Sequence, residues 1–308
     1  MISIVIPLYN EERNVASLHK ELTTALSKLS QKSEIIYVND GSTDKTLCEL
    51  KKLSQTKVIT LRKNFGQTAA LNAGFQNAKG EIIITLDGDL QNDPADISKL
   101  IEKIHQGFDV VSGWRKNRQD SFSKKLLSQG ARQLRKIILK DTTRDSGCSL
   151  KAYRREALED LHLFGETHRF IPAILAWQGY KAVEIPVNHR PRTQGRTKYN
   201  YKRLIKGLLD MGVVWFWYKF SDRPLYLFGG VGSLLFLAGL AIGGWMFVER
   251  FFLGMSLQNR IWPLISVFSL LAGIQLFGLG ILADIGLKTY FSRNRRKTIK
   301  EISRSQVS

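Results

Sequence analysis

The chain has 308 residues, of which 46 are Lys or Arg and 27 are Asp or Glu, so its formal net charge is +19 at pH 7. This length allows one sizeable domain plus something smaller, because domains usually hold about 100–200 residues. The charge invites a nucleic-acid hypothesis, but no recognition module is visible and many cations lie beside two apolar stretches, so we expect no nucleic-acid partner. Two cysteines, Cys48 and Cys148, are too few for a disulfide framework or a zinc cluster.

Short β-rich runs alternate with helix-patterned stretches in the first part of the chain. The predicted strands are Ser3–Pro7, Glu34–Val38, Lys57–Leu61, Glu81–Leu86 and Asp109–Gly113, and the predicted helices are Val15–Leu29, Lys45–Leu53, Gln67–Ala78 and Ala95–Gly107. This order predicts an α/β domain with a doubly wound, mostly parallel sheet. The N-terminal run reads as the first strand, because it lacks the charged lead and long apolar core of a cleavable signal. In such sheets ligands bind at the carboxyl ends of the strands.

Polar residues follow the first two predicted strands. Asn10, Ser42 and Asp44 are candidates either for capping the next helices or for a binding site. Asp40 ends a buried strand, where a carboxylate can accept hydrogen bonds from the base or ribose of a nucleotide. Tyr9 has two interpretations, since it can stack on that base or belong to the core.

The fourth predicted strand runs into the sequence Asp87-Gly88-Asp89-Leu90-Gln91. Side chains alternate between faces in an extended chain, so Asp87 and Asp89 are expected to point the same way. Gly88 would let the backbone approach a ligand closely. Carboxylates suit Mg²⁺ or Mn²⁺ that bridges the phosphates of a nucleotide, so this segment predicts a divalent-cation site.

A basic stretch from Lys116 to Lys140 follows the fifth predicted strand. Its apolar residues fall near one helical face: Phe122, Leu126, Leu134, Ile137 and Ile138. This pattern indicates a basic amphipathic helix on a membrane surface, or else a surface helix packed on the sheet. Tyr201–Phe220 is a similar element, and its final aromatic residues suit a bilayer interface.

The segment Arg190–Tyr199 is a Gly-containing basic loop. It offers four cations, Arg190, Arg192, Arg196 and Lys198, together with two threonine hydroxyls. These groups can clamp phosphate. The alternative is a plain solvated loop.

Leu225–Val248 and Ile261–Ala283 contain no Asp, Glu, Lys, Arg or His. Each exceeds the roughly 20 apolar residues that span a bilayer, so we predict two transmembrane helices joined by Glu249–Arg260. The alternative is a buried apolar hairpin of a soluble protein. The many glycines fit helices that pack closely in lipid. The predicted domains are 1–220, the membrane hairpin 221–287 and a basic tail 288–308.

Basic residues flank the two apolar stretches unevenly. They are Lys202, Arg203, Lys206, Lys219 and Arg223 before the first stretch, Lys288, Arg293, Arg295, Arg296, Lys297 and Lys300 after the second, and Arg250 and Arg260 between them. The positive-inside rule then places the large domain and both termini in the cytoplasm. We expect a multi-pass protein of the cytoplasmic (inner) membrane.

Four motifs in this order resemble family-2 glycosyltransferases of the GT-A fold. They are Val5–Glu12, Val38–Ser42, Asp87–Gln91 and Arg192-x-x-Gly195-x-Thr197-Lys198. The resemblance covers residues 1 to about 220. The two C-terminal spans narrow it to polyprenyl-phosphate glycosyltransferases, which include dolichyl-phosphate mannose synthases and bacterial undecaprenyl-phosphate sugar transferases.

The resemblance implies an inverting transfer of a sugar from a nucleotide sugar, expected to be UDP-linked, to a polyprenyl (undecaprenyl) phosphate, with Mg²⁺ or Mn²⁺ as cofactor. It implies donor binding by Pro7, Tyr9, Glu11, Asp40, Asp87, Gly88, Asp89 and Gln91, with the metal at Asp87, Asp89 and Gln91. It implies phosphate and lipid binding by Arg115, Arg118, Arg132, Arg192, Arg196 and Lys198. The implied catalytic residues are Asp89, Arg115, Arg132 and Asp145.

One position departs from the family pattern. Some relatives carry an Asp after the glycine that corresponds to Gly147, whereas this chain has Cys148, so Asp145 is a substitute candidate for a base. Two alternative functions stay open: a family-2 transferase with a polysaccharide or other non-polyprenyl acceptor, and a non-catalytic membrane-anchored binder of nucleotide sugars. The segment after Gly147 lacks the Gln-x-x-Arg-Trp pattern of processive members. The glycine-rich spans also allow a homo-oligomer.

Overall fold

The computed structural model describes residues 1–116, 143–159, 165–191, 201–220, 223–254 and 260–293, together with positions 130, 133, 136, 161, 163 and 256. The chain divides into two compact units, Met1–Val214 and Trp215–Ser308.

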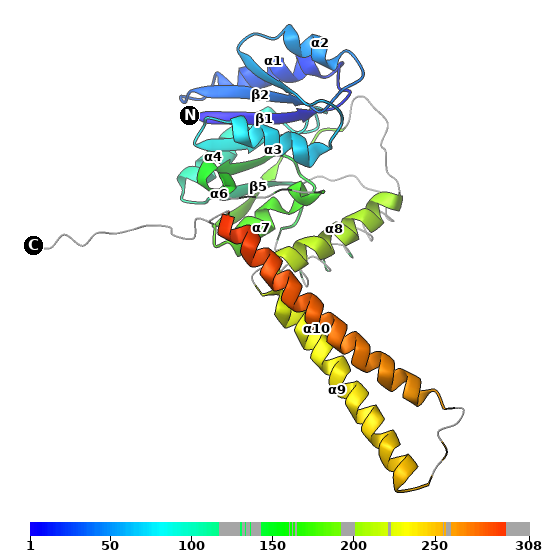
Figure 1. The fold of residues 1–308 in the computed structure, drawn as a ribbon. Coiled ribbons are helices and arrows are strands. Elements are labelled where there is room, and N and C mark those ends of the chain that lie inside the picture. The colour runs from blue at the N-terminus through cyan, green and yellow to red at the C-terminus, as the bar shows by residue number, and fades with distance from the viewer. Residues whose placement is uncertain are drawn as a thin grey trace, which may run out of the picture. The chain divides into compact units, whose positions relative to one another are not determined.

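The first unit is built on a seven-stranded sheet with the order β3-β2-β1-β4-β6-β5-β7 (Figure 1). The strands are β1 (Ile2–Leu8), β2 (Ser33–Asn39), β3 (Thr56–Thr60), β4 (Ile82–Thr85), β5 (Val110–Arg115), β6 (Lys151–Arg154) and β7 (Ala182–Val187). Neighbouring strands are parallel except where β6 pairs antiparallel with β4 and β5. The predicted doubly wound, mostly parallel sheet is confirmed.

Helices cover both faces of this sheet. They are α1 (Val15–Leu26), α2 (Thr46–Lys51), α3 (Gln67–Asn77), η1 (Pro94–Asp96), α4 (Ile97–His105), α6 (Arg155–Glu159), η2 (Thr167–Phe170) and α7 (Ile171–Trp177). Apolar residues of α1 and α4 share one buried cluster with Ile4 and Ile6 of β1. On the other face Gly74 of α3 lies so close to Val5 that an added Cβ would stand 2.2 Å from a Val5 methyl carbon. Because both faces are covered, the central strands are nearly continuous apolar runs.

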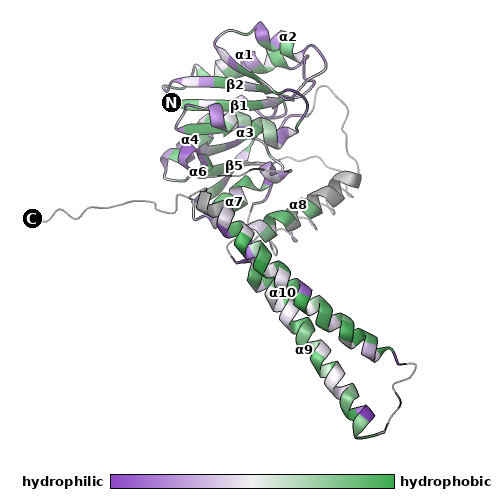
Figure 2. Cartoon of the chain, viewed as in Figure 1, coloured by the Kyte–Doolittle hydropathy of each residue, from purple (hydrophilic) through white to green (hydrophobic). Residues whose placement is uncertain are grey.

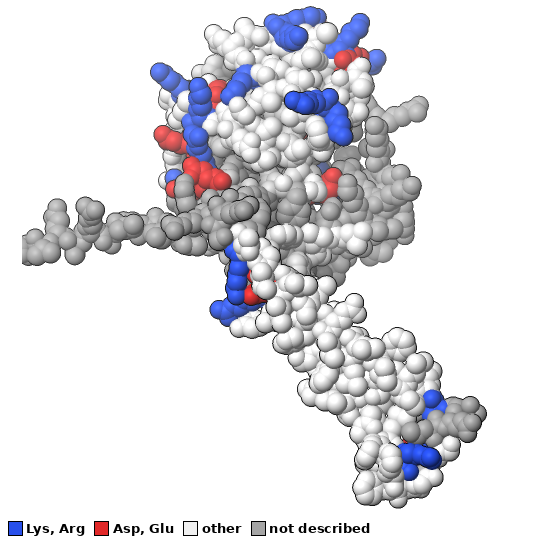
Figure 3. Space-filling model, viewed as in Figure 1, with Lys and Arg blue, Asp and Glu red and all other residues white. Residues whose placement is uncertain are grey.

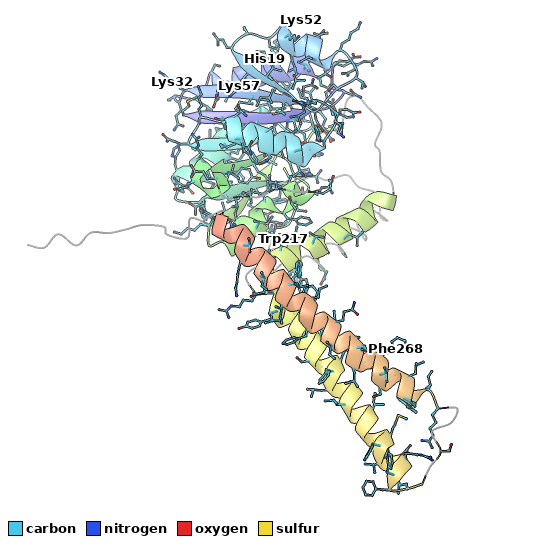
Figure 4. All side chains as sticks on the ribbon, in the orientation of Figure 1. His19, Lys32, Lys52, Lys57, Trp217 and Phe268 are labelled. Carbon is cyan, nitrogen blue, oxygen red and sulfur yellow. The ribbon has the colours of Figure 1, made fainter. Side chains whose placement is uncertain are left out.

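The sheet has β3 and β7 at its two ends. Strand β3 carries Lys57, labelled in Figure 4, whose ammonium group donates to the carbonyl of Asn77 at 3.1 Å. A lysine on an edge strand discourages pairing with another chain. Strands β6 and β7 were not predicted, and β6 is the one that runs against its neighbours in the part of the chain that the structure describes.

The second unit contains the long helices α9 (Pro224–Phe251) and α10 (Trp262–Arg293), preceded by α8 (Tyr201–Phe220). The 28-residue segments Pro224–Phe251 and Trp262–Thr289 each include an 18-residue window with a mean hydropathy of 2.1, and they contain or nearly contain the two predicted apolar stretches (Figure 2). At 1.5 Å per residue each is about 42 Å long, more than the roughly 30 Å hydrocarbon core of a bilayer. Both are long and apolar enough to cross a membrane.

Small residues bring α9 and α10 together. An added Cβ at Gly232 would lie 2.7 Å from the Gly273 carbonyl oxygen, and one at Gly273 would lie 2.6 Å from that of Gly232. Ser266 donates from its hydroxyl to the Gly239 carbonyl at 2.7 Å. The contact is therefore nearly backbone to backbone, as predicted from the glycines.

Large apolar side chains point outward from this hairpin. Leu234 is 69% exposed, and Phe268, labelled in Figure 4, is 62% exposed. In the space-filling view the shaft of the hairpin is almost free of charge, and charged residues lie at its two ends (Figure 3). A hairpin buried inside a soluble protein would hide these side chains, so the exposed surface favours the membrane interpretation.

The basic charge is less localised than the sequence argument assumed. Lys and Arg side chains also lie across the visible face of the first unit (Figure 3). The cations therefore do not gather only beside the apolar helices.

Candidate active site

The acidic pair follows β4 directly, but in a turn. The sequence predicted a strand that reaches Leu86 and an extended chain through the carboxylates, and this geometry is wrong: β4 ends at Thr85, and Gly88 and Asp89 lie in a turn that places Leu90 at φ +60°. The reason is packing. A Cβ at Gly88 would stand 2.1 Å from a Leu8 methyl carbon, so the turn lies tightly over the end of β1.

Asp87 and Asp89 nevertheless lie close enough to interact. Burial, and then repulsion from the Asp89 carboxylate, raises the pKa of Asp87 to about 6. Three groups act against this rise: the Ser149 hydroxyl, the charge of Lys151, and Gln67, which donates to Asp87 Oδ1 at 2.7 Å. A cation would stabilise this pair, in which Asp89 is buried and Asp87 is half-buried.

The donor set fits a hard divalent cation whose coordination shell is completed from outside the protein. Among the described residues no group of three or more His, Cys, Asp or Glu side chains could hold a metal ion. Mg²⁺ is commonly bound through one or two carboxylates plus substrate phosphates and water. Asp89 Oδ1 accepts from the Gln91 amide at 3.2 Å, so the third predicted metal residue lies in the same turn.

The acidic turn is anchored to the segment that follows β7. Arg190 donates from its backbone amide to the Gln91 carbonyl at 2.8 Å, and Asn92 forms a bridge with His189. The Arg190 guanidinium contacts Glu21 at 2.7 Å and Asp93 at 3.0 Å. Arg190 therefore ties the loop after β7 to the acidic turn and to α1, and phosphate binding by the loop that it begins stays a prediction.

The loops after β1 and β2 hold one another. Asn10 donates from its amide to the Ser42 hydroxyl at 3.0 Å, and the Asn10 side chain accepts from the Thr43 amide at 2.8 Å. Asp44 accepts from the amides of Thr46 at 2.9 Å and Glu12 at 3.2 Å. Asp44 thus accepts a hydrogen bond from the first residue of α2, as a capping residue does. Asn10 and Ser42 instead connect the loops after β1 and β2 by hydrogen bonds.

The predicted nucleotide residues lie at this same edge. Both Asp40 carboxylate oxygens accept from backbone amides, those of Phe65 at 2.8 Å and Gly66 at 2.9 Å, which fixes the loop before α3. Tyr9 is 40% exposed, so the core interpretation is wrong. Pro7 lies in β1, and Glu11 accepts from the Asn14 side chain at 2.5 Å. Nucleotide binding by these residues stays a prediction.

Arg115 and Asp145 form a two-pronged ion pair at the end of β5. Arg115 donates from Nε to Asp145 Oδ2 at 2.6 Å and from Nη2 to Oδ1 at 2.8 Å. The side chains are only 17% and 10% exposed. The structure therefore brings together two residues that the sequence placed in one site, and it shows the carboxylate holding the guanidinium.

The other predicted cations, Arg118, Arg132, Arg192, Arg196 and Lys198, lie outside the described residues. So do most of the basic stretch 116–140 and the tail beyond residue 293. Their roles stay predictions.

Sequence reasoning missed the neighbours of Asp87. Gln67 begins α3, Ser149 precedes β6, and Lys151 is a buried lysine in β6. Ser149 accepts from the Asp87 amide at 3.2 Å and from the Asn92 side chain at 2.7 Å. No local motif marks these residues: the pairing of β6 with β4 brings Ser149 and Lys151 to the acidic turn, and the start of α3 brings Gln67.

Comparison with known families identifies the class of protein. Residues 3–162 match the family described as Glycosyl transferase family 2, and the chain belongs to this family. Solved structures agree on the fold. Glucosyl-3-phosphoglycerate synthase from Mycobacterium tuberculosis, in complex with Mn²⁺ and uridine-diphosphate-glucose, superimposes with a TM-score of 0.56 at 17% identity, over 70% of this chain and 78% of that chain. The same enzyme with Mg²⁺ and uridine-diphosphate gives 0.54 at 18% identity, over 68% and 79%. The predicted GT-A class is confirmed.

Curated relatives place the chain more narrowly. It is 37% identical over 303 residues to the dodecaprenyl-phosphate galacturonate synthase of Rhizobium johnstonii (strain DSM 114642 / LMG 32736 / 3841), covering 94% of this chain and 88% of that protein. It is 36% identical over 293 residues to the undecaprenyl-phosphate 4-deoxy-4-formamido-L-arabinose transferase of Salmonella choleraesuis (strain SC-B67), covering 92% and 87%. The chain is a glycosyltransferase, as predicted.

Proposed function

We propose that this glycosyltransferase moves a sugar from a nucleotide sugar to a polyprenyl phosphate. The observation that carries the proposal is the extent of similarity: both relatives are named for a polyprenyl phosphate and a sugar, and each alignment covers more than nine-tenths of this chain. The acidic turn at the carboxyl edge of the sheet supplies the matching chemistry, since it suits a cation beside a diphosphate.

The reaction needs a nucleophile, a leaving group and charge stabilisation. A phosphate monoester has its second ionisation near pH 6, so the acceptor is largely a dianion at neutral pH and attacks without a protein base. One of its oxygens bonds to the anomeric carbon, and the bond from that carbon to the nucleoside diphosphate breaks with its electron pair. A divalent cation, when bound, offsets the negative charge that develops on the departing diphosphate.

The chain's own residues orient these groups. Asp87 and Asp89 would hold the cation, and Asp40, Tyr9 and Glu11 would bind the nucleotide of the donor. Asp145 occupies Nε and one Nη2 hydrogen of Arg115, so the guanidinium would offer Nη1 and the second Nη2 hydrogen to phosphate oxygens. The bound nucleotide of the similar solved structures supports a uridine diphosphate donor.

The membrane arrangement follows from the acceptor. A polyprenyl chain stays in the bilayer, so the reaction must take place at its surface. We infer that α9 and α10 span the cytoplasmic membrane, with the first unit and both termini in the cytoplasm. On α8, Leu209 and Val213 are exposed, which supports contact with the lipid interface.

Incubation of the purified protein with undecaprenyl phosphate, Mn²⁺ and a panel of nucleotide sugars tests the proposal. The mass of the lipid product identifies the sugar. Asp89→Ala should abolish transfer, whereas Asp109→Ala should keep it, because Asp109 pairs with Arg154 at the amino end of β5. Transfer only to a saccharide acceptor would contradict the proposal. Donor binding without any product would favour a non-catalytic binder.

A further inference from the structure

A carboxylate on the last strand holds the segment that carries Asp145. Glu184 lies in β7 opposite Ser112 of β5. Its Oε2 accepts from the backbone amide of Arg144 at 2.7 Å, and its Oε1 accepts from that of Asp145 at 3.3 Å. One side chain thus fixes two successive peptide groups.

The fixed segment in turn determines where the Arg115 guanidinium lies. The Asp145 carboxylate accepts from Nε and Nη2 of Arg115, from the Arg115 amide at 3.3 Å and from the Gly147 amide at 3.2 Å. Both carboxylate oxygens of Asp145 are therefore engaged by Arg115 and by the backbone of Gly147. Gly147 leaves little room, since an added Cβ would lie 3.1 Å from Arg115 Nη2.

The same short segment also reaches the acidic turn. Four residues after Asp145, the Ser149 hydroxyl accepts from the Asp87 amide. Arg115 and Asp87 are therefore tied to the two ends of one segment, and a shift of that segment would move both. Glu184 is thereby linked to both residues through backbone amides of this segment.

We propose that Glu184 is a positioning residue for Arg115. It fixes residues 144–147 so that Asp145 orients the guanidinium toward the phosphates held at the acidic turn. Under this arrangement Asp145 acts through Arg115 and does not take a proton in the reaction. The inference rests on the proposed transferase function. Beyond that function, it assigns Glu184 to the residues that shape the site and gives Asp145 the role of orienting Arg115.

A double-mutant cycle tests the proposal through kcat/KM for sugar transfer. Glu184→Ala should lower kcat/KM about tenfold, as expected when charge-assisted hydrogen bonds that orient a group are lost. In the Arg115→Lys background, which keeps the charge but loses the paired geometry, the same substitution should change kcat/KM less than twofold, because interacting residues are not additive. Glu184→Gln keeps one acceptor and should fall between. Equal losses in both backgrounds would overturn the proposal.

Glu34→Ala is the matched control. Glu34 also accepts from a backbone amide, that of Lys79 at 2.6 Å, and from the Ser3 hydroxyl, but it lies at the start of β2 at the opposite edge. It should leave kcat/KM unchanged in either background. A loss of kcat/KM in Glu34→Ala equal to that in Glu184→Ala would show that the effect is general destabilisation and would overturn the proposal.

Asp145 gives a second discriminating measurement. Asp145→Asn should lower kcat/KM without removing the acidic limb of the pH profile, whereas loss of that limb would assign a proton-transfer role and overturn the proposal. Hydrogen exchange separates this idea from the function itself. The amides of 144–147 should exchange faster in Glu184→Ala whether or not the wild type makes a lipid product, and unchanged exchange would refute the positioning role independently of activity.

Discussion

Protonation of Asp87 should control metal affinity in a pH range where an ordinary aspartate would not. With a pKa of about 6, roughly one Asp87 in eleven is ionised at pH 5, against about nine in ten at pH 7. Because a proton and a cation compete for this carboxylate, the apparent affinity for Mn²⁺ should fall about tenfold from pH 7 to pH 5. An aspartate with an ordinary pKa near 3.9 would be ionised throughout this range, and the affinity would barely change.

Electron paramagnetic resonance of free Mn²⁺ measures this affinity directly. A nucleotide sugar is the right co-ligand, because its diphosphate has no terminal monoester group that titrates near pH 6. Gln67→Leu removes a hydrogen bond that lowers the pKa of Asp87, so it should move the midpoint to higher pH. Gln31→Leu, at the exposed far edge, should leave the midpoint in place. An affinity that is flat from pH 5 to pH 7 in the wild type would refute the reasoning.

Three substitutions test other features. Asp87→Asn should abolish transfer yet raise the melting temperature of the metal-free protein at pH 7. The pKa of Asp87 is higher in the folded state than in the unfolded state, so ionisation of this carboxyl destabilises the fold as pH rises from about 4 to about 6. An unchanged or lower melting temperature would contradict this reasoning. Gly88→Ala should cost about 1–3 kcal/mol of folding free energy, measured by denaturant unfolding. The same substitution should cost less in a Leu8→Ala background, which lacks the methyl group that the new Cβ would meet. No cost in the wild-type background would contradict the close contact. Gly232→Val should lower the melting temperature of the detergent-solubilised protein, because the new side chain would meet the backbone of α10. Gly230→Val should leave it unchanged, since a Cβ at Gly230 meets nothing within 4 Å. Equal effects would argue against the backbone contact.

The central strands could be predicted because burial on both faces leaves an unbroken apolar run. Ile82 to Ile84 of β4 and Ile4 to Ile6 of β1 are of this kind. Strands β6 and β7 gave no such signal. The first has four residues and begins with the buried Lys151, and the second contains Glu184 and Pro186. Polar residues in these strands serve the site, so the pattern that marks a core strand is absent.

The acidic pair could be predicted from its place after an apolar strand, but its geometry could not. The turn depends on Leu90 at positive φ and on Gly88 packed against Leu8, neither of which follows from strand periodicity. The partners of Asp87 come from three separate elements. Their proximity is a property of strand order, which the local sequence does not contain.

The ion pair between Arg115 and Asp145 has a consequence for the sheet, because it joins the end of β5 to the segment that leads into β6. Strand β5 ends at Arg115 and β6 begins at Lys151. The ion pair between Arg115 and Asp145 connects the end of β5 to a residue six positions before β6. The register of β5 and β6 is thus held by described residues alone, through this ion pair and through the pairing of these two strands with each other and with β4 and β7.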